Sequence, residues 1–190
     1  MNVRTLSPAP AVRHFDVAAL ARDTLRVQAQ ALGMPPRALD RRAAERRARA
    51  SRGLTALGAF AGSRLVGFAY GIPAGRSYPW RDPVTARLHA AGRSVWAEDS
   101  FYLCELHVLP EFQGRGLGTR LLTSLCSRAT EPRVILTTPH RPSAARRLYA
   151  RHGYHDLVTA GSDPGDDDPY VVMGAQLPLL PAAFRAAQAA

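Results

Sequence analysis

The chain has 190 residues and a formal net charge of +10, and its 25 basic residues are all Arg. This length fits one domain with a full hydrophobic core, and a content of 46% hydrophobic and 21% charged residues is ordinary for a globular chain. No apolar run is long enough to span a bilayer, and the first residues lack the apolar core of a secretory signal, so we expect a cytoplasmic location.

The spacing of apolar residues predicts a succession of short strands and helices. In chain order they are strand Val3–Leu6, helices Phe15–Leu32 and Arg37–Ala50, strands Leu54–Ala61, Arg64–Ile72 and Phe101–Leu109, a helical pattern from Leu117 to Ala129, strand Arg133–Thr138, helix Pro142–Arg151, and strands Tyr154–Thr159 and Tyr170–Leu177. This order predicts an α/β (α+β) fold with a mixed, mostly antiparallel central sheet of about six or seven strands and helices on both sides. Residues 1–177 are expected to form this single domain, followed by a tail at 178–190.

The segment Arg76–Ser100 is longer than a turn between two neighbouring strands requires. It carries Tyr78, Trp80 and Trp96, and Val84–Ala91 has the composition of a short helix. Long insertions in compact domains are usually functional, so we expect this segment to cover an acceptor pocket. The alternative is a surface lobe built around its own aromatic cluster.

The strand at Phe101–Leu109 leads into a glycine-rich turn and then a helix. The turn reads Q-G-R-G-L-G over residues 113–118. A strand, a glycine turn and a helix N-terminus together direct several main-chain N–H groups at one anion, and glycine allows a phosphate to approach the backbone closely. The sequence therefore predicts a diphosphate site at this turn.

The spacing of the glycines separates the known kinds of phosphate loop. A P-loop requires a Lys after its last glycine, and this chain has no Lys. A dinucleotide fingerprint requires G-x-G-x-x-G, whereas Gly114, Gly116 and Gly118 are spaced G-x-G-x-G. Both of these ligand classes are excluded.

The remaining pattern, Q-x-x-G-x-G after a strand that ends V-x-P, resembles the acyl-CoA signature of the GNAT N-acetyltransferase superfamily. It is carried by Gln113, Gly116 and Gly118, with Val108 and Pro110 upstream. A second segment, A-A-R-R-L-Y-A-R-H-G-Y at residues 144–154, is similar to the later helix of that superfamily. One position departs from the pattern, because Pro142 stands where many members have an Asn that contacts the pantetheine arm.

The resemblance implies a GNAT-like fold and acetyl-CoA as the acetyl donor. It places the diphosphate on the residues of the glycine turn and the first helical turn, which are Gln113, Gly114, Arg115, Gly116, Leu117, Gly118 and Thr119. The preceding strand is splayed from its neighbour in that fold, so the N–H groups of Leu106, His107 and Val108 are the expected donors to the thioester oxygen, and a β-bulge there would free them.

The same resemblance puts Tyr149 beside the thioester sulfur, where it is the expected general acid and a further contact of the donor. Strand alternation places Glu105 and His107 on one face. Glu105 is the expected general base, with His107 or water as alternatives, and an ion pair with one of the Arg residues is the structural alternative for Glu105.

The expected function is acetyl transfer to a primary amine, of a small molecule first, by direct attack in a ternary complex. Acetylation of a protein N-terminus or lysine is one alternative, and a non-catalytic CoA-binding regulatory module is another. The acidic run Asp163–Asp168 is a turn that could attract a cationic acceptor. Nucleic acid is a weaker partner, because Arg41–Arg52 has no interleaved aromatic residues.

Two further expectations concern metals and assembly. Cys104 and Cys126 lack metal-ligand spacing and lie in apolar patterns, so we expect buried thiols and no metal site. The oligomeric state stays open, with a homodimer as one alternative.

Overall fold

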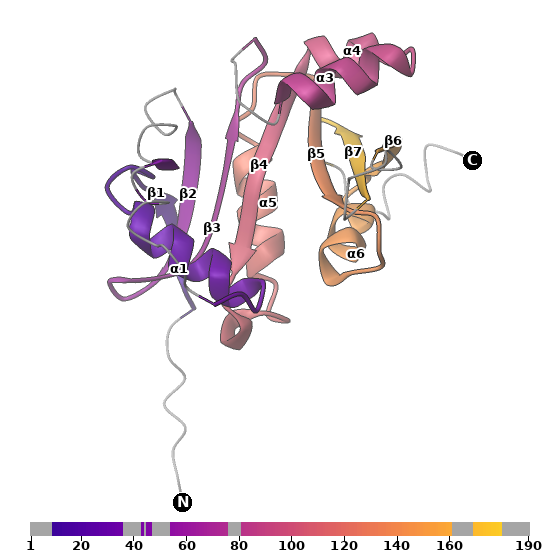
Figure 1. Cartoon of the computed structure of the whole chain (residues 1–190). Helices are drawn as coiled ribbons and strands as arrows, with labels where there is room; N and C mark the ends of the chain where they lie inside the picture. The colour runs from indigo at the N-terminus through magenta and orange to yellow at the C-terminus, as the bar shows by residue number, and fades with distance from the viewer. Residues whose placement is uncertain are drawn as a thin grey trace, which may run out of the picture.

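The computed structural model describes residues 9–35, 43, 45–46, 54–75, 81–160 and 169–179. Within these ranges seven strands form one mixed sheet in the order β1-β2-β3-β4-β5-β7-β6, and helices cover both of its faces (Figure 1). All neighbouring strands pair antiparallel except β4 and β5, which are parallel. The predicted fold class is confirmed.

The strands are β1 (Ala11–His14), β2 (Thr55–Ala61), β3 (Arg64–Ile72), β4 (Ser100–Val108), β5 (Arg133–Pro139), β6 (His155–Ala160) and β7 (Tyr170–Gln176). The helices are α1 (Ala21–Ala31), α3 (Arg81–Ala90), α4 (Ser94–Glu98), α5 (Leu117–Cys126) and α6 (Ala144–Arg151), with the 3-10 turn η1 at Pro110–Phe112. No helix in the described ranges combines the length and the apolar character that a membrane crossing needs.

Most predicted elements are found within a few residues of their expected ends. The helix expected from Phe15 begins only at Ala21, because the chain turns first and the Asp16 carboxylate accepts the N–H of Ala18 at 2.7 Å. The strand β1 and the short helix α4 were not predicted. The predicted strand Val3–Leu6 lies outside the described residues, and so do the acidic run Asp163–Asp168 and most of the helix predicted at Arg37–Ala50 and of the tail.

Strands β4 and β5 pair over a short stretch only and then diverge. β4 pairs with β3 from Tyr102 to Val108, but it pairs with β5 only along Ser100–Tyr102, opposite Arg133–Ile135. Beyond these three residue pairs the two strands diverge, and the sheet is split at its centre (Figure 1). The expected splay of the strand before the glycine turn is therefore present.

A β-bulge sets which side chains of β4 face which side of the sheet. Glu105 pairs with Tyr70 and Leu103 pairs with Gly71, so Cys104 is an extra residue without a partner on β3. Because of this extra residue, Leu103 packs with the larger core while Glu105 contacts Gln28 of α1 on the opposite face. The bulge lies at Cys104, before the Leu106–Val108 stretch where it was expected.

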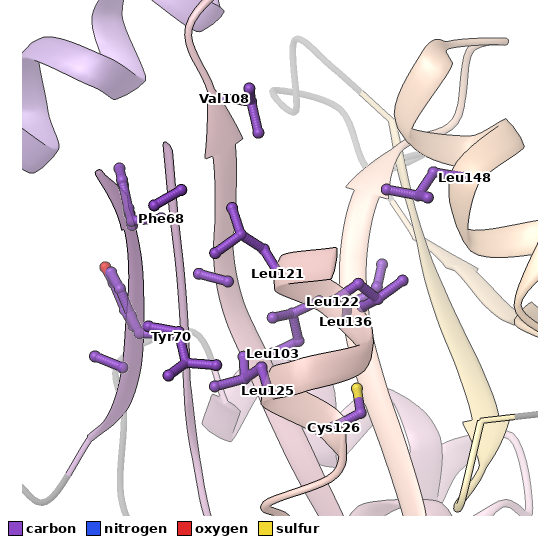
Figure 2. Packing of buried hydrophobic residues seen from close by; sticks show 14 of the residues in the cluster. Phe68, Tyr70, Leu103, Val108, Leu121, Leu122, Leu125, Cys126, Leu136 and Leu148 are labelled. Carbon is purple, nitrogen blue, oxygen red and sulfur yellow. The ribbon is translucent and has the colours of Figure 1, made fainter. Parts of the chain in front are cut away.

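Part of the larger core lies between the sheet and α5, which is apolar on one side. Leu121, Leu122 and Leu125 of α5 gather with Leu103 of β4 and Leu136 of β5 (Figure 2). All of these side chains are at most 3% exposed. Helix α5 thereby fixes the position of the glycine turn that precedes it.

The described part of the long insertion packs at the other end of β4. Val84 and Leu88 of α3 and Trp96 of α4 form a second core with Tyr102 of β4 and Ile135 of β5. Residues 76–80 lie outside the described residues. The prediction that this segment covers an acceptor pocket stays a prediction, and the packing of α3 and α4 offers it no support.

Candidate active site

The split between β4 and β5 opens into a cleft of about 730 Å³. One wall is β4 from Leu103 to Val108, and the opposite wall is β5 from Leu136 to Pro139. The glycine turn and the start of α5 close one end, α6 contributes residues from Ser143 to Arg151, and the last turn of α1 contributes Ala31 and Leu32. The cleft thus collects residues from five elements.

The β4 wall offers main-chain donors to the cleft. Leu109 donates its N–H to the carbonyl of Val66 at 2.9 Å, so this pair is hydrogen-bonded to β3. Because bonded and non-bonded pairs alternate along an antiparallel ladder, the N–H of His107 also points to β3, while those of Leu106 and Val108 point away from β3 into the split. Of the three donors expected on this strand, Leu106 and Val108 are thus oriented for an oxyanion.

The glycine turn is held in the conformation that its sequence suggests. Gly114 has φ 71° and Gly116 has φ 77°, a left-handed conformation that a side chain disfavours. The Gln113 amide donates to the carbonyl of Val108 at 2.9 Å, which fastens the turn to β4. Gln113 therefore shapes the turn with its side chain in addition to lining the cleft.

Helix α5 begins at this turn without a side-chain cap. Gly116 is its N-cap, no acidic residue lies in its first turn, and the first helical hydrogen bond is donated by Arg120 to Gly116 at 3.0 Å. The N–H groups of Leu117, Gly118 and Thr119 consequently have no partner within the helix. Such a helix start, with its dipole, favours a negatively charged group at this end of the cleft.

Helix α6 forms the wall that faces the start of α5. A Cβ added at Gly118 would lie 3.4 Å from the Leu148 side chain, so the two helices approach closely there. Ser143 caps α6 by accepting the N–H of Arg146 at 3.1 Å. Pro142, expected in the first helical turn, therefore precedes the cap and lies outside the helix.

Tyr149 reaches the cleft from α6 and is only 7% exposed. Its ring lies 5.4 Å from the ring of Tyr154. Burial, followed by the nearby Cys126 and Glu105, raises the pKa of the Tyr149 phenol far above its ordinary value. Tyr149 is consequently a neutral proton donor at physiological pH, as a general acid must be.

Glu105 and His107 meet on the other side of β4. His107 Nε2 lies 2.6 Å from Glu105 Oε2, and Arg46 Nη2 donates to Glu105 Oε1 at 3.2 Å. Burial alone would raise the pKa of Glu105, but the hydrogen bond to His107 and the charge of Arg46 together hold it below its usual 4.5. Glu105 is thus ionised and paired, so the ion pair considered for it is present, and its role as base stays a prediction.

The predicted site residues converge on the cleft with one exception. Every one of them lines it except Arg115, which is exposed on the turn. Sequence reasoning missed Arg147 and Arg151, two cleft-lining cations one helical turn apart on α6. Their i, i+4 spacing, which puts both on one face of the helix, was the available signal. Within the ranges that the structure describes, His, Cys, Asp and Glu form no cluster suited to a metal ion.

Known proteins share both the sequence pattern and this architecture. A GCN5-like protein acetyltransferase of Mycobacterium tuberculosis is 35% identical over 123 residues, which cover 60% of this chain and 60% of that protein. This chain therefore matches less than two thirds of that relative's length.

Two solved structures have the same fold. YncA of Salmonella typhimurium, solved with its cofactor acetyl-CoA, has a TM-score of 0.62 at 19% identity and covers 91% of this chain and 96% of its own. The ribosomal-protein-S18-alanine N-acetyltransferase of Escherichia coli has a TM-score of 0.60 at 15% identity, with 91% and 97% covered.

The match to the sequence model of the acetyltransferase (GNAT) family extends over residues 20–154, from the turn before α1 to the residue before β6. This stretch contains both walls of the cleft, the glycine turn and Tyr149. As the resemblance in the sequence indicated, the chain belongs to the GNAT acetyltransferase family.

Proposed function

We propose that this chain is an acetyl-CoA-dependent N-acetyltransferase that transfers an acetyl group to the primary amine of a small molecule by direct attack in a ternary complex. The observation that carries this proposal is the pair of main-chain donor sets on one cleft. The first set is on the split strand β4, and the second is at the uncapped start of α5. This arrangement suits an elongated donor that has a thioester at one end and a diphosphate at the far end of the arm that carries it.

The diphosphate is assigned to the start of α5. The N–H groups of Leu117, Gly118 and Thr119 donate to its oxygens, and Gly114 and Gly116 keep the turn free of side chains. A Cβ added at either glycine would meet no atom within 4 Å, so packing inside the protein does not require glycine there. The left-handed backbone and the room needed by the ligand favour it instead.

The donor supplies a thioester, whose carbonyl carbon the amine attacks and whose thiolate leaves. The N–H groups of Leu106 and Val108 donate to the carbonyl oxygen as it gains negative charge. Tyr149 gives its phenolic proton to the departing thiolate. The Glu105–His107 pair removes the proton from the attacking amine, because an ammonium has no lone pair with which to attack.

A free-thiol assay with acetyl-CoA and a panel of amines tests this function. We expect release of coenzyme A with at least one small amine and stoichiometric formation of its N-acetyl product by mass spectrometry. Binding of acetyl-CoA by calorimetry, with no thiol release for any amine or peptide, would instead identify a CoA-binding regulatory module.

A second acceptor class is favoured by one observation. The 35% identical relative from Mycobacterium tuberculosis is a protein acetyltransferase, and the match includes no more than 60% of it. Peptides with a free N-terminus and peptides with one internal lysine therefore belong in the panel. Turnover of these peptides without turnover of any small amine would assign a protein acceptor.

A further inference from the structure

A polar cluster behind β4 connects the candidate base to Gln28 and Arg46, which no motif of the sequence assigned to the site. Gln28 of α1 donates to Glu105 Oε2 at 3.0 Å and accepts from Arg46 Nη2 at 2.8 Å. Tyr70 of β3 also lies close enough to Glu105 to help lower the pKa of its carboxyl. Glu105 is therefore held on both carboxylate oxygens by groups from several elements.

The charge of Glu105 decides which nitrogen of His107 carries a proton. An ionised carboxylate can only accept hydrogen bonds, so the 2.6 Å contact requires a proton on His107 Nε2. In the neutral ring the lone pair then resides on Nδ1. No described residue hydrogen-bonds to Nδ1, and His107 lines the cleft. The ring is also steadied by Phe68, whose centroid lies 5.5 Å away.

Arg46 is placed in a way that stability alone does not explain. Its side chain is 10% exposed and lies over the rings of Phe68 and Tyr70, with its guanidinium carbon 5.9 and 5.8 Å from their centroids. Its Nη1 is buried and has no hydrogen-bond partner among the residues that the structure describes. Burying a cation with an unsatisfied nitrogen is unfavourable, and apolar residues usually fill such positions at lower cost. A role in the site accounts for the retained charge.

We propose that His107 Nδ1 is the general base of the acetyl transfer, and that Glu105, Arg46 and Gln28 are positioning residues that fix its tautomer. As the C–N bond forms, Nδ1 takes the proton of the attacking amine and the ring becomes an imidazolium beside the Glu105 carboxylate. Tyr149 delivers its own proton to the thiolate. This role rests on the acetyl transfer proposed above and assigns the proton within the Glu105–His107 pair.

Arg46 also affects the pH range in which the Glu105 carboxyl is ionised and the base can accept a proton. After the hydrogen bond from His107, the charge of Arg46 is the next cause that lowers the pKa of the Glu105 carboxyl against the effect of burial. Without Arg46 the carboxyl of Glu105 holds its proton to higher pH, so the acid limb of the kcat/KM profile moves upward. Tyr70 and Tyr149, which face Glu105 from β3 and α6, are uncharged and leave this direction unchanged.

The tautomer is tested on the free protein by long-range ¹H–¹⁵N NMR of ¹⁵N-histidine, with His107 assigned through a His107→Gln variant. We expect the Nε2–H tautomer for His107, and a mixture of tautomers in Glu105→Ala. An Nδ1–H tautomer, or an unchanged spectrum in Glu105→Ala, would overturn the assignment. This measurement needs no acceptor, so its outcome is independent of the proposed activity.

The role of Arg46 is tested by kinetics with the amine that gives turnover in the panel. We expect Arg46→Met to lower kcat roughly tenfold at neutral pH, to leave the KM for acetyl-CoA near its original value, and to move the acid limb to higher pH. Arg46→Lys keeps the positive charge and should retain part of the rate that Arg46→Met loses. If Arg46→Met does not fold, Arg46→Lys still tests the effect of this position on the pH profile.

Arg64→Met is the matched control. Arg64 forms an exposed ion pair with Glu111 at 2.9 Å, away from the cleft, and its loss should leave rate and pH profile unchanged. A pH profile that is identical in wild type, Arg46→Met and Arg46→Lys refutes a positioning role, because a purely structural residue changes the amount of folded protein but not the shape of that profile.

Discussion

Tyr149 presents a hydroxyl proton to the cleft that ordinary pH does not remove, because burial raises the pKa of its phenol. Tyr149→Phe should therefore lower kcat about tenfold or more, while acetyl-CoA affinity measured by calorimetry changes little. In the wild type, loss of activity from ionisation of this phenol should begin only above the usual tyrosine value of about 10.

Tyr154→Phe is the control for this prediction. The Tyr154 ring lies 5.4 Å from that of Tyr149, but its hydroxyl meets the Cys126 thiol at 3.6 Å in the core. We expect a loss of stability with kcat retained. If both variants lose kcat equally, the effect belongs to packing and Tyr149 is not the acid.

Arg147 and Arg151 add positive charge to the α6 wall of the cleft, which suits the phosphates of the donor. Arg147→Ala should weaken binding of coenzyme A roughly fivefold, the scale of one exposed ionic contact. Calorimetry with dephospho-CoA, which lacks the 3′-phosphate, shows which phosphate Arg147 contacts.

An equal loss for the two ligands would place Arg147 at the diphosphate, and a loss for coenzyme A alone would place it at the 3′-phosphate. Arg115→Ala is the comparison, because Arg115 lies on the glycine turn but outside the cleft lining. If Arg115→Ala weakens coenzyme A binding and Arg147→Ala does not, the positive charge that contacts the phosphates comes from the glycine turn and not from α6.

At the residue scale, the sequence predicted the groups that belong to continuous motifs. Gly116, Gly118 and Tyr149 were found because their spacing is local and repeats a family pattern. Gln28 and Arg46 could not be found in this way, because they lie 77 and 59 residues from the carboxylate that they contact. Such contacts are made by packing, which no local pattern encodes.

The glycine turn acts as one element with α5, and its backbone conformation should matter more than its side chains. Gly116→Ala places a side chain at φ 77° and should lower the free energy of unfolding by about 1 kcal/mol. It should also weaken acetyl-CoA binding, because the first N–H groups of α5 shift. Chemical denaturation and calorimetry measure the two effects.

Gly62→Ala is a matched control in the β2–β3 hairpin. Gly62 has φ 61° and, like Gly116, open space where a Cβ would lie. We expect a similar loss of stability and unchanged affinity for acetyl-CoA. Equal affinity in Gly116→Ala and wild type would remove the turn from the donor site.

Among the elements, those with long apolar periods were predicted well. The hairpin of β2 and β3 was found with its turn, as were β5 and β7, because each buries a continuous run of side chains. The four-residue β1 and the five-residue α4 are too short to show a period. The bulge at Cys104 was expected a few residues later, since its place depends on pairing with β3.

For the whole molecule, the donor should act as a stabilising ligand because its assigned site spans both halves of the split sheet. Acetyl-CoA at 100 times its Kd should add about 2.7 kcal/mol to the free energy of unfolding. A thermal shift that grows with ligand concentration measures this. Pantetheine, which lacks the phosphates, should give a much smaller shift, and equal shifts for the two would contradict a phosphate site at α5.

Because β4 and β5 diverge early, main-chain N–H groups of β4 face the split before any ligand binds. Entry of an extended molecule breaks no strand pairing, since the sheet there joins across only three residue pairs. The arm of coenzyme A carries amide groups of its own, so it can take the place of an absent neighbouring strand. Donor recognition then resembles the addition of one short strand to an open edge inside the protein, and it is preorganised because that edge is built by the fold.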